Sequence, residues 1–344
     1  MSTTYYSKLV FIGRFQPFHL GHKRVVTDAL QQAEHLLILI GSSFQPRTIK
    51  NPFTYEERQQ MILASLDPQD IARVTIRPLR DYLYNDQQWI AQVQQIVDVT
   101  SDPADKIGIV GYTKDGSSWY LKEFPQWDFL EVDYNDQIDA TSIRGMWMLG
   151  QSPRYASGVL TDSVHKFMYT TFAKNQREEL SRLNREYLHI ENYKKQWEVA
   201  PYAPTFVTSD AVVIQSGHIL LVQRKASPGE GLFAFPGGFV GQNETVLDAS
   251  IRELREETKL KVPEPVLLGS VKASKVFDAP GRSLRGRTIT HAFLFELASG
   301  PLPKVKGSDD AQQAKWVTLA EFQKMEDKLF EDHFHIGMYF LGQV

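Results

Sequence analysis

Two stretches of this 344-residue chain carry side chains whose types and spacing suit phosphate chemistry. Residues 13–22 read Gly-Arg-Phe-Gln-Pro-Phe-His-Leu-Gly-His, and residues 252–257 read Arg-Glu-Leu-Arg-Glu-Glu. Histidine and arginine at the start of a helix can donate hydrogen bonds to phosphate oxygens, so the first stretch suits formation of a phosphoanhydride bond. Clustered glutamates can hold a divalent cation, so the second stretch suits cleavage of such a bond.

The first stretch places its histidines so that both rings can converge on one point. His19 and His22 are three residues apart at the expected start of a helix, and Gly21 between them admits close approach of a ligand to the backbone. An isolated histidine pair would be interpreted as a helix cap. Six positions fit one template, however, and chance explains that poorly. They are Gly13, Phe15, Pro17, His19, Gly21 and His22.

The second stretch places Glu253, Glu256 and Glu257 at positions i, i+3 and i+4 of an expected helix, so they share one face. Carboxylates this close repel one another unless a cation lies among them, and Mg²⁺ prefers such oxygen ligands. The alternative is an ordinary solvated acidic face. The stretch also belongs to a longer frame of residues that extends back to Gly238 and Glu244.

Composition narrows the class of protein. The chain has no cysteine, which excludes disulfides, thiolate nucleophiles and cysteine-bound zinc. Its net charge of −3 does not indicate a nucleic-acid-binding surface. Residues 1–13 lack the pattern of a secretory signal, and the apolar run Leu36–Ile40 is too short to span a bilayer. We therefore expect a cytoplasmic protein with no nucleic-acid or membrane partner, and a homo-oligomer remains open.

The N-terminal half alternates strand and helix patterns, which predicts an α/β fold with a doubly wound, Rossmann-like parallel sheet. On such sheets ligands bind at the carboxyl ends of the strands, where the 13–22 stretch falls. The expected strands are 9–12, 36–41, 74–78, 107–111 and 129–132. The expected helices are 21–33, 55–66, 87–99 and 142–149.

The C-terminal part has a different texture, which predicts a separate α+β domain with a mixed sheet. A hairpin is expected from strands 207–214 and 218–223, followed by a helix over 244–258 and strands near 266–272 and 288–297. Between the two parts, residues 163–197 are helical and charged, and 199–204 form a proline-containing linker. We predict domains at 1–185 and 205–344, joined by 186–204.

The first stretch resembles the His-x-Gly-His signature of the nucleotidylyltransferase superfamily, and more narrowly the archaeal-type nicotinamide mononucleotide (NMN) adenylyltransferases. Three further segments of residues 8–150 carry the likeness, in the expected order. Asn51 begins Asn-Pro-Phe-Thr; Asp81, Asn85 and Trp89 resemble a nicotinamide pocket; Thr141, Ser142 and Arg144 resemble a phosphate motif that opens a helix. Trp89 could stack on a pyridinium ring, although a lone tryptophan on a helix usually packs in a core.

This resemblance implies that AMP is transferred from ATP to NMN, giving NAD and pyrophosphate. Arg14, His19, His22 and Arg144 would orient the triphosphate, with Mg²⁺ screening its charge. Gly13, Phe15 and Gly21 would shape the binding loop. A different acceptor, such as a pantetheine phosphate, is disfavoured by the Asn51 and Trp89 segments. The choice between NMN and nicotinic acid mononucleotide stays open.

The second stretch resembles the Nudix box, in which Glu253, Glu256 and Glu257 would ligate Mg²⁺ or Mn²⁺ and Glu244 and Arg252 would support them. One letter departs, because Lys259 stands where the box has glycine. Glycine there would permit a left-handed helix cap, which lysine adopts at a cost of about 1 kcal/mol.

The whole chain resembles the bacterial bifunctional NMN adenylyltransferase/Nudix hydrolases. That resemblance implies hydrolysis of ADP-ribose to AMP and ribose 5-phosphate, with Arg282 and Arg285 meeting the diphosphate; a solvated basic loop is nearly as good an interpretation of these arginines. Two alternatives remain for the second domain. It could sense ADP-ribose or NAD without cleaving it, or cleave another nucleoside diphosphate.

Overall fold

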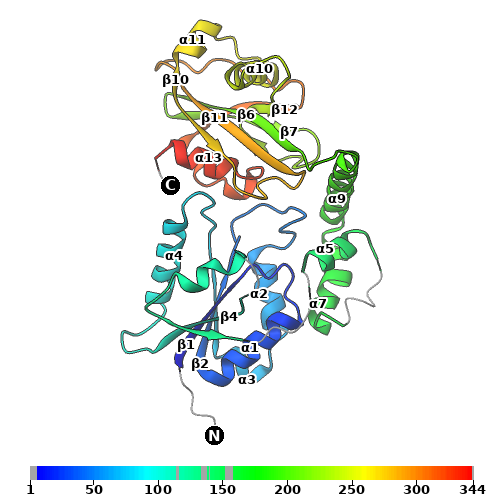
Figure 1. Cartoon of the computed structure of the whole chain (residues 1–344), viewed down its shortest axis with the longest axis vertical. Helices are drawn as coiled ribbons and strands as arrows, with labels where there is room; N and C mark the ends of the chain where they lie inside the picture. The colour runs from blue at the N-terminus through cyan, green and yellow to red at the C-terminus, as the bar shows by residue number, and fades with distance from the viewer. Residues whose placement is uncertain (1–5, 114–115, 133–137, 139, 152–157, 343–344) are drawn as a thin grey trace. The chain divides into compact units, whose positions relative to one another are not determined.

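The computed structural model describes residues 6–113, 116–132, 138, 140–151 and 158–342 of the chain. Two compact units are present, residues 1–184 and 185–344, and the division falls inside helix α9 (Arg177–Trp197) (Figure 1). Residues 198–204, after this helix, form neither helix nor strand. The finer domain boundaries expected from the sequence stay a prediction.

The N-terminal unit is built on a parallel sheet of five strands in the order β3-β2-β1-β4-β5. This order confirms the predicted doubly wound fold, because the chain starts in the middle of the sheet and winds outward in both directions. The strands are β1 (Tyr6–Gly13), β2 (Ala33–Ile40), β3 (Val74–Pro78), β4 (Ile107–Gly111) and β5 (Asp128–Glu131).

Alternating side chains of β1 bury both faces of this sheet. Val10 and Ile12 pack in one core with Val93 of helix α4. Phe11 points to the opposite face, where its ring lies 6.3 Å from that of His22 in helix α1. The helices of this unit are α1 (Leu20–Gln32), α2 (Tyr55–Leu63), α3 (Pro68–Ile71), α4 (Asp86–Asp98), α5 (Ala140–Met148), α7 (Asp162–Lys166) and α8 (Ala173–Asn175). A 3-10 helix η1 (Gly116–Lys122) and a π-helix η2 (Phe167–Phe172) complete it.

The C-terminal unit contains a mixed sheet with the path β10-β11-β6-β7-β12, while β8 pairs with β7 and β9 with β6. Strands β11 and β6 run parallel and the other pairs antiparallel, as the predicted mixed sheet requires. The strands are β6 (Thr205–Gln215), β7 (His218–Arg224), β8 (Phe233–Ala234), β9 (Gly237–Phe239), β10 (Val271–Phe277), β11 (Arg287–Glu296) and β12 (Ala311–Thr318).

Helices lie on both sides of the mixed sheet (Figure 1). Ile251 and Leu254 of α10 (Val246–Thr258) pack against Phe293 of β11 in one core. On the other side, Phe322 of α12 (Leu319–Phe322) stacks on Phe334 of α13 (His333–Phe340). The 3-10 helix η3 (Glu326–Lys328) precedes α13.

One predicted strand is wrong. Residues 264–269, which overlap the strand expected near 266–272, form helix α11 (Glu264–Gly269), and the strand itself, β10, begins only at Val271. A short apolar run does not distinguish a strand from a buried helix turn. Pro265 in the first turn of α11 is the local signal for a helix start that the apolar run obscures.

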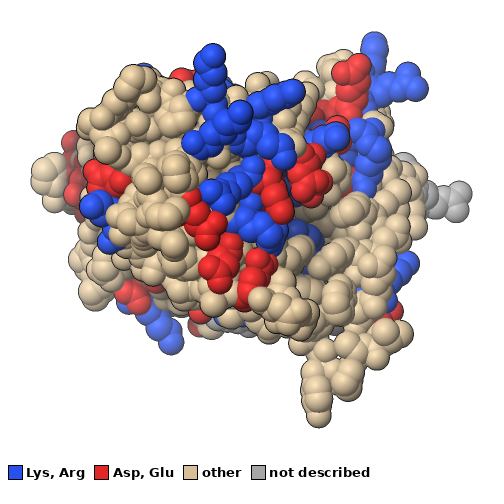
Figure 2. All heavy atoms as spheres, turned by 90° about the horizontal axis from the view of Figure 1, so that it is seen from above, with Lys and Arg blue, Asp and Glu red and all other residues tan. Residues whose placement is uncertain are grey.

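The surface carries both signs of charge. On the face seen in Figure 2, basic side chains gather next to acidic ones, and neither sign covers that face alone. This distribution fits the net charge of −3. Across the described ranges, none of the helices combines the length and the apolar character needed to cross a lipid bilayer.

Lys259 closes α10 in the left-handed conformation, with φ of 52° and its N–H donating to the carbonyl of Arg255. The geometry is the one that glycine adopts freely, so Lys259→Gly is expected to raise the unfolding free energy of the C-terminal unit by about 1 kcal/mol. Urea denaturation followed by circular dichroism would measure this. Lys261→Gly, two residues beyond the cap, is the control and should not stabilise; equal effects would contradict the explanation.

Candidate active sites

The N-terminal unit holds a cleft of about 550 Å³ at the carboxyl ends of its strands. Most of the residues predicted for this site line it, whereas Gly21, Asn51, Asn85 and Ser142 do not. The predicted residues on its wall are Gly13, Arg14, Phe15, His19, His22, Asp81, Trp89, Thr141 and Arg144.

The two histidines cap helix α1 reciprocally. The backbone N–H of His22 donates to Nδ1 of His19 at 3.4 Å, and the N–H of His19 donates to Nδ1 of His22 at 3.3 Å. Their rings stack with centroids 3.6 Å apart. The cap interpretation and the catalytic interpretation are therefore compatible, since the same pair can satisfy backbone donors with one nitrogen and face a ligand with the other.

This capping fixes the tautomer of both rings. A ring whose Nδ1 accepts a hydrogen bond carries its proton on Nε2 when it is neutral. Burial, and next the neighbouring His19, lower the pKa of His22 well below its usual value, so His22 is neutral around neutral pH. In each neutral ring the proton is thus on Nε2, the nitrogen that the helix cap does not use.

Buried polar side chains lock the loops around the histidines. Gln16 exchanges two hydrogen bonds with the backbone of Phe53, at 2.8 and 3.0 Å. The guanidinium of Arg58, which is 1% exposed, donates to the carbonyls of Arg14, Gly41 and Ser42. Burial lowers the pKa of Arg58 to about 10, which still leaves it charged at neutral pH. Loops after β1 and β2 are therefore held together by one cation.

Glycine and phenylalanine in the first motif serve packing. A Cβ on Gly13 would lie 2.8 Å from the ring of Phe15, so glycine makes room for that ring. Phe15 itself has a positive φ of 54° and meets the ring of His22 edge-on at 4.9 Å. These two residues therefore position His22.

The predicted nicotinamide pocket is assembled only in part. Asp81 accepts hydrogen bonds from the N–H and hydroxyl of Ser42, at 3.1 and 2.7 Å, and lies on the cleft wall. Trp89 is on the same wall, its ring 5.6 Å from that of Tyr120. Asn85 instead caps α4 through its side-chain oxygen, which accepts from the N–H of Gln88.

The predicted phosphate motif is anchored at the start of α5. Arg144 is 6% exposed; its guanidinium donates to the carbonyl of Gln16 at 2.6 Å and to the hydroxyl of Thr141 at 3.1 Å. Ser142 is exposed and lies off the cleft wall. The side-chain oxygen of Asn51 is buried with no hydrogen-bond partner among the described residues.

Sequence reasoning missed the aromatic and hydroxyl side chains that follow β4. Tyr112, Ser118 and Tyr120 line the cleft, and the Tyr120 hydroxyl donates to the carbonyl of Ile12 at 3.1 Å. No fixed spacing connects them to residues 13–22. The available signal was topological, because β4 lies beside β1 and its carboxyl end must share the same edge.

The C-terminal unit holds a second cleft, of about 330 Å³, lined by charged side chains of both signs. Glu253, Glu257, Arg282 and Arg285 are on its wall as predicted, whereas Glu256 is not. Sequence reasoning missed Asp210, Arg224, Asp309 and Asp310; Glu331 lies on the same wall, although no motif supported it. They come from strand ends and loops far apart in the chain, which no local motif connects.

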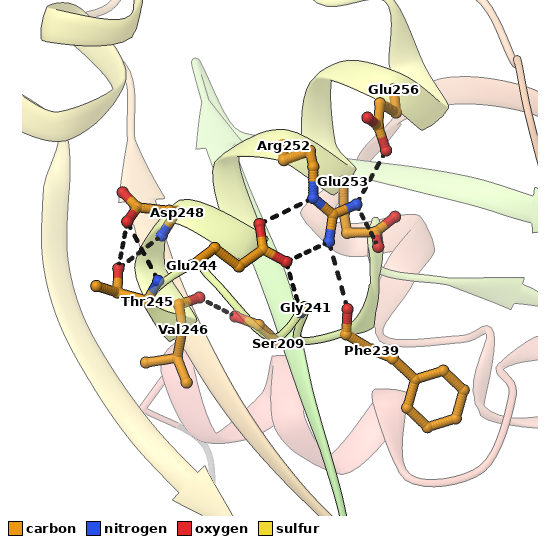
Figure 3. Close-up of polar contacts among 10 residues, drawn as sticks. All are labelled: Ser209, Phe239, Gly241, Glu244, Thr245, Val246, Asp248, Arg252, Glu253 and Glu256. Carbon is orange, nitrogen blue, oxygen red and sulfur yellow. Dashed lines mark hydrogen bonds and ion pairs between the residues drawn. The ribbon is translucent and has the colours of Figure 1, made fainter.

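Arg252 organises the glutamates of the second motif (Figure 3). Its guanidinium donates to both carboxylate oxygens of Glu244, at 2.9 and 2.7 Å. It also donates to Glu253 at 2.8 Å and to Glu256 at 3.0 Å. Hydrogen bonds from Arg252 and from the N–H of Gly241 lower the pKa of Glu244 to about 2. Arg252 thus contacts Glu244 and two of the three clustered glutamates, and the supporting role of Glu244 and Arg252 stays a prediction.

Two glycines let the carboxylates approach the sheet. A Cβ on Gly238 would lie 2.4 Å from a carboxylate oxygen of Glu253, and the N–H of Gly237 donates to Glu257 at 3.1 Å. Burial raises the pKa of Glu257 to about 8, and burial likewise raises that of Glu253. Glycine at both positions therefore brings acidic groups together in a poorly hydrated place.

The donor set fits a hard divalent cation, although the arrangement is not a finished metal centre. In the portion of the chain that is described, no three acidic or histidine side chains already converge as ligands. Glu253, Glu256 and Glu257 nevertheless share one helix face, and the buried pair among them would be stabilised by a positive charge. Mg²⁺ and Mn²⁺ both accept such oxygen ligands.

The predicted diphosphate arginines have different surroundings. Arg282 donates to both oxygens of Asp332, at 2.8 and 2.6 Å, and both side chains are at most 3% exposed. Arg285 lies with its guanidinium 5.4 Å from the ring centre of Phe239 and 3.9 Å from Glu331. Arg224 covers the ring of Phe330 at 4.2 Å. Of these three arginines, Arg282 is the one whose guanidinium is held in a close, buried ion pair.

The Arg282–Asp332 pair leads to a stability prediction. Arg282→Met leaves the Asp332 carboxylate buried without its counter-charge, so the unfolding free energy of the C-terminal unit should fall by about 3–5 kcal/mol. Urea denaturation would measure the change. The double variant Arg282→Met/Asp332→Leu removes both charges and should recover most of the loss. A single variant as stable as wild type would contradict a structural role for the pair.

Known families and proteins match the two units of the chain in turn. The cytidylyltransferase-like family model matches residues 10–144 and the NUDIX domain model matches residues 205–338. A nicotinamide/nicotinic acid mononucleotide adenylyltransferase of Acinetobacter baylyi is 44% identical over 144 residues, which are 42% of this chain and 76% of that protein. An ADP-ribose pyrophosphatase of Methanocaldococcus jannaschii is 36% identical over 135 residues, 38% of this chain and 75% of that protein.

A solved structure resembles the whole chain. The crystal structure of a bifunctional NMN adenylyltransferase/ADP ribose pyrophosphatase from Francisella tularensis is 40% identical, with a TM-score of 0.90, and the match covers 98% of this chain and 99% of that one. A second structure of that protein, complexed with AMP and a Mn ion, matches with a TM-score of 0.91.

Fold and sites together define a two-domain protein in which a nucleotidylyltransferase domain precedes a Nudix domain. More particularly, the chain belongs to the family of bifunctional NMN adenylyltransferase/ADP-ribose pyrophosphatases.

Proposed function

We propose that the N-terminal cleft joins NMN and ATP to give NAD and pyrophosphate, and that the C-terminal cleft hydrolyses ADP-ribose to AMP and ribose 5-phosphate. The observation that carries this proposal is the presence of both clefts, each with its motif residues on the wall, in one chain that matches a bifunctional enzyme over 98% of its length. The chain thus makes and breaks phosphoanhydride bonds at separate sites.

For adenylyl transfer, a phosphate oxygen of NMN forms a bond to the α-phosphorus of ATP while the bond to pyrophosphate breaks. The attacking oxygen is already anionic, so no general base is needed. His19 and His22 each present an Nε2–H to the phosphate oxygens as negative charge builds up, and Arg14 and Arg144 hold the triphosphate. Trp89 offers an aromatic surface on the same wall for the nicotinamide ring.

For hydrolysis, we propose that Glu253, Glu256 and Glu257 hold Mg²⁺, with Mn²⁺ as an alternative. When bound, such an ion polarises a diphosphate and lowers the pKa of water. Arg252 keeps two of these glutamates in place, since it donates to both. Arg224 and Arg285, on the cleft wall, bind diphosphate oxygens.

Assays of the purified chain test both halves of the proposal. We expect NAD from NMN and ATP, and AMP from ADP-ribose, each dependent on added Mg²⁺ or Mn²⁺. A panel of other nucleoside diphosphate substrates would define the preference of the second site, and nicotinic acid mononucleotide that of the first. Tight binding of ADP-ribose without release of AMP would replace hydrolysis with sensing at the C-terminal site.

A further inference from the structure

Three acidic side chains on the wall of the hydrolytic cleft, those of Asp210, Glu253 and Glu257, already accept hydrogen bonds. Asp210 accepts from the hydroxyl of Thr290 at 2.5 Å, and Glu257 accepts from the N–H of Gly237. Glu253 accepts from Arg252. Asp332, next to the cleft, is held by Arg282. These groups are committed to structure or to the metal-binding face.

Glu331 differs from them. Its carboxylate lines the cleft and is 12% exposed, and its nearest ion-pair partner, Arg285, is 3.9 Å away, beyond hydrogen-bonding distance. Of the other groups around it, Ser283 donates a hydrogen bond that lowers its pKa, and Arg282 and Asp332 act through their charges. The charge of Glu331 also acts on Arg224 of β7, whose pKa it raises against the larger effect of burial. The carboxylate is thus enclosed, accepts from Ser283, and forms no close ion pair among the described residues.

The backbone of Glu331 is strained where it holds this carboxylate. Glu331 has a positive φ of 46°, a conformation that disfavours residues other than glycine. The chain is anchored on both sides of Glu331: the N–H of Phe330 donates to the carbonyl of Phe233 at 2.8 Å, and Nδ1 of His333, two residues on, accepts from the N–H of Phe235 at 3.0 Å. Strain held between two anchored points is typical of functional positions.

The environment also suits proton transfer. Burial raises the pKa of Glu331, and Arg285 and then Arg282 oppose this rise. A carboxylate whose pKa moves toward neutrality is a better proton acceptor than a solvated one, provided that the reacting proton comes within reach.

We propose that Glu331 is the general base of the hydrolytic site, which takes a proton from the water that attacks the diphosphate. This inference rests on the proposed hydrolysis of ADP-ribose. The water oxygen forms a bond to one phosphorus, and the bond from that phosphorus to the bridging oxygen breaks. The bridging oxygen leaves with the electron pair, and the water proton goes to the Glu331 carboxylate.

Glu331→Gln tests the proposal, with Asp327→Asn as the matched control because it removes an exposed acid from the same segment. For Glu331→Gln we expect kcat for AMP release from ADP-ribose to fall by about 10²–10⁴-fold with KM little changed. The acidic limb of the pH–rate profile should disappear. Mn²⁺ affinity, measured by electron paramagnetic resonance, and NAD synthesis by the same preparation should match wild type.

Glu331→Gly separates catalysis from backbone strain. Glycine accepts the positive φ, so this variant should unfold at no lower temperature than wild type and yet lose the same activity. An unchanged kcat in Glu331→Gln would overturn the proposal. So would a loss confined to KM with the pH profile intact, which would make Glu331 only a counter-ion for Arg285. Absence of AMP release by the wild-type chain would overturn the proposed hydrolysis and this inference together.

Discussion

His19→Ala is expected to lower kcat for NAD synthesis by about 10²–10³-fold while ADP-ribose hydrolysis stays near wild type. His19 lies on the wall of the N-terminal cleft, and the reciprocal cap uses its Nδ1, so we expect its Nε2–H to donate to the phosphate. Removal of one preorganised donor to a developing negative charge typically costs that factor. Initial rates of NAD formation and AMP release from one preparation would measure both effects.

The control for this variant is His19→Asn. Alanine removes a helix cap as well as a donor, and loss of a cap costs about 1 kcal/mol of stability. Asparagine is a good N-cap residue and its oxygen can replace Nδ1 of His19, but its short side chain does not reach the position of Nε2. We expect His19→Asn to lose the same activity with little loss of stability. Recovery of activity by asparagine would assign the effect to helix capping alone.

Glu257→Gln is expected to produce the reverse pattern, with hydrolysis of ADP-ribose reduced at least ~100-fold and NAD synthesis intact. Glu257 lies on the wall of the C-terminal cleft, on the helix face that carries the other two glutamates of the motif. Glutamine keeps the shape but loses the charge that a divalent cation requires. Loss of both activities in folded protein would contradict two independent sites.

The same substitution should stabilise the metal-free protein at alkaline pH. Burial raises the pKa of Glu257 to about 8 from an ordinary value of 4.5, so the protonated form favours folding. Its contribution to stability is fully present below pH 4.5 and is lost as the pH rises through about 8. Glutamine cannot ionise. In EDTA, the unfolding free energy of Glu257→Gln should therefore rise relative to that of wild type as the pH increases across this window. The difference should be no more than about 5 kcal/mol.

Thermal unfolding in EDTA at several pH values would check this, with Glu264→Gln as an exposed control on the neighbouring helix. Added Mn²⁺ should stabilise wild type more than Glu257→Gln. Equal stability of the two proteins at alkaline pH would mean that the Glu257 carboxylate is not held in a poorly hydrated place.

Local patterns predicted most of the fold. Short apolar runs followed by helical spacing predicted the parallel strands. The i, i+3 and i+4 spacing of the glutamates predicted helix α10. The strand expected near 266–272 was wrong, because Val266, Leu267 and Leu268 form an apolar run too short to show a period. Residues 264–269 form a helix instead. Pro265 in its first turn is a local signal that could have predicted the helix start.

The candidate-site residues were predicted where a recognisable local segment carries them. One helix start positions two predicted residues on the wall of the first cleft, His19 and His22. One helix face positions two on the wall of the second cleft, Glu253 and Glu257. Arg224 and Glu331 come from separate strand ends and loops, and only tertiary packing brings them to the same wall. Asn85 illustrates the opposite case, since its residue type before a helix is also that of an ordinary N-cap.

The reciprocal cap of α1 makes the local fold and the chemical state of the site a single equilibrium. Protonation of either ring would place a hydrogen on Nδ1 and remove the acceptor that holds the partner's backbone N–H. The cap therefore opposes protonation of either ring, and by linkage protonation must loosen the first turn of the helix. ATP binding and the folding of this first turn should consequently depend on pH together. We expect the affinity for the triphosphate to fall over the same pH range in which the turn unfolds.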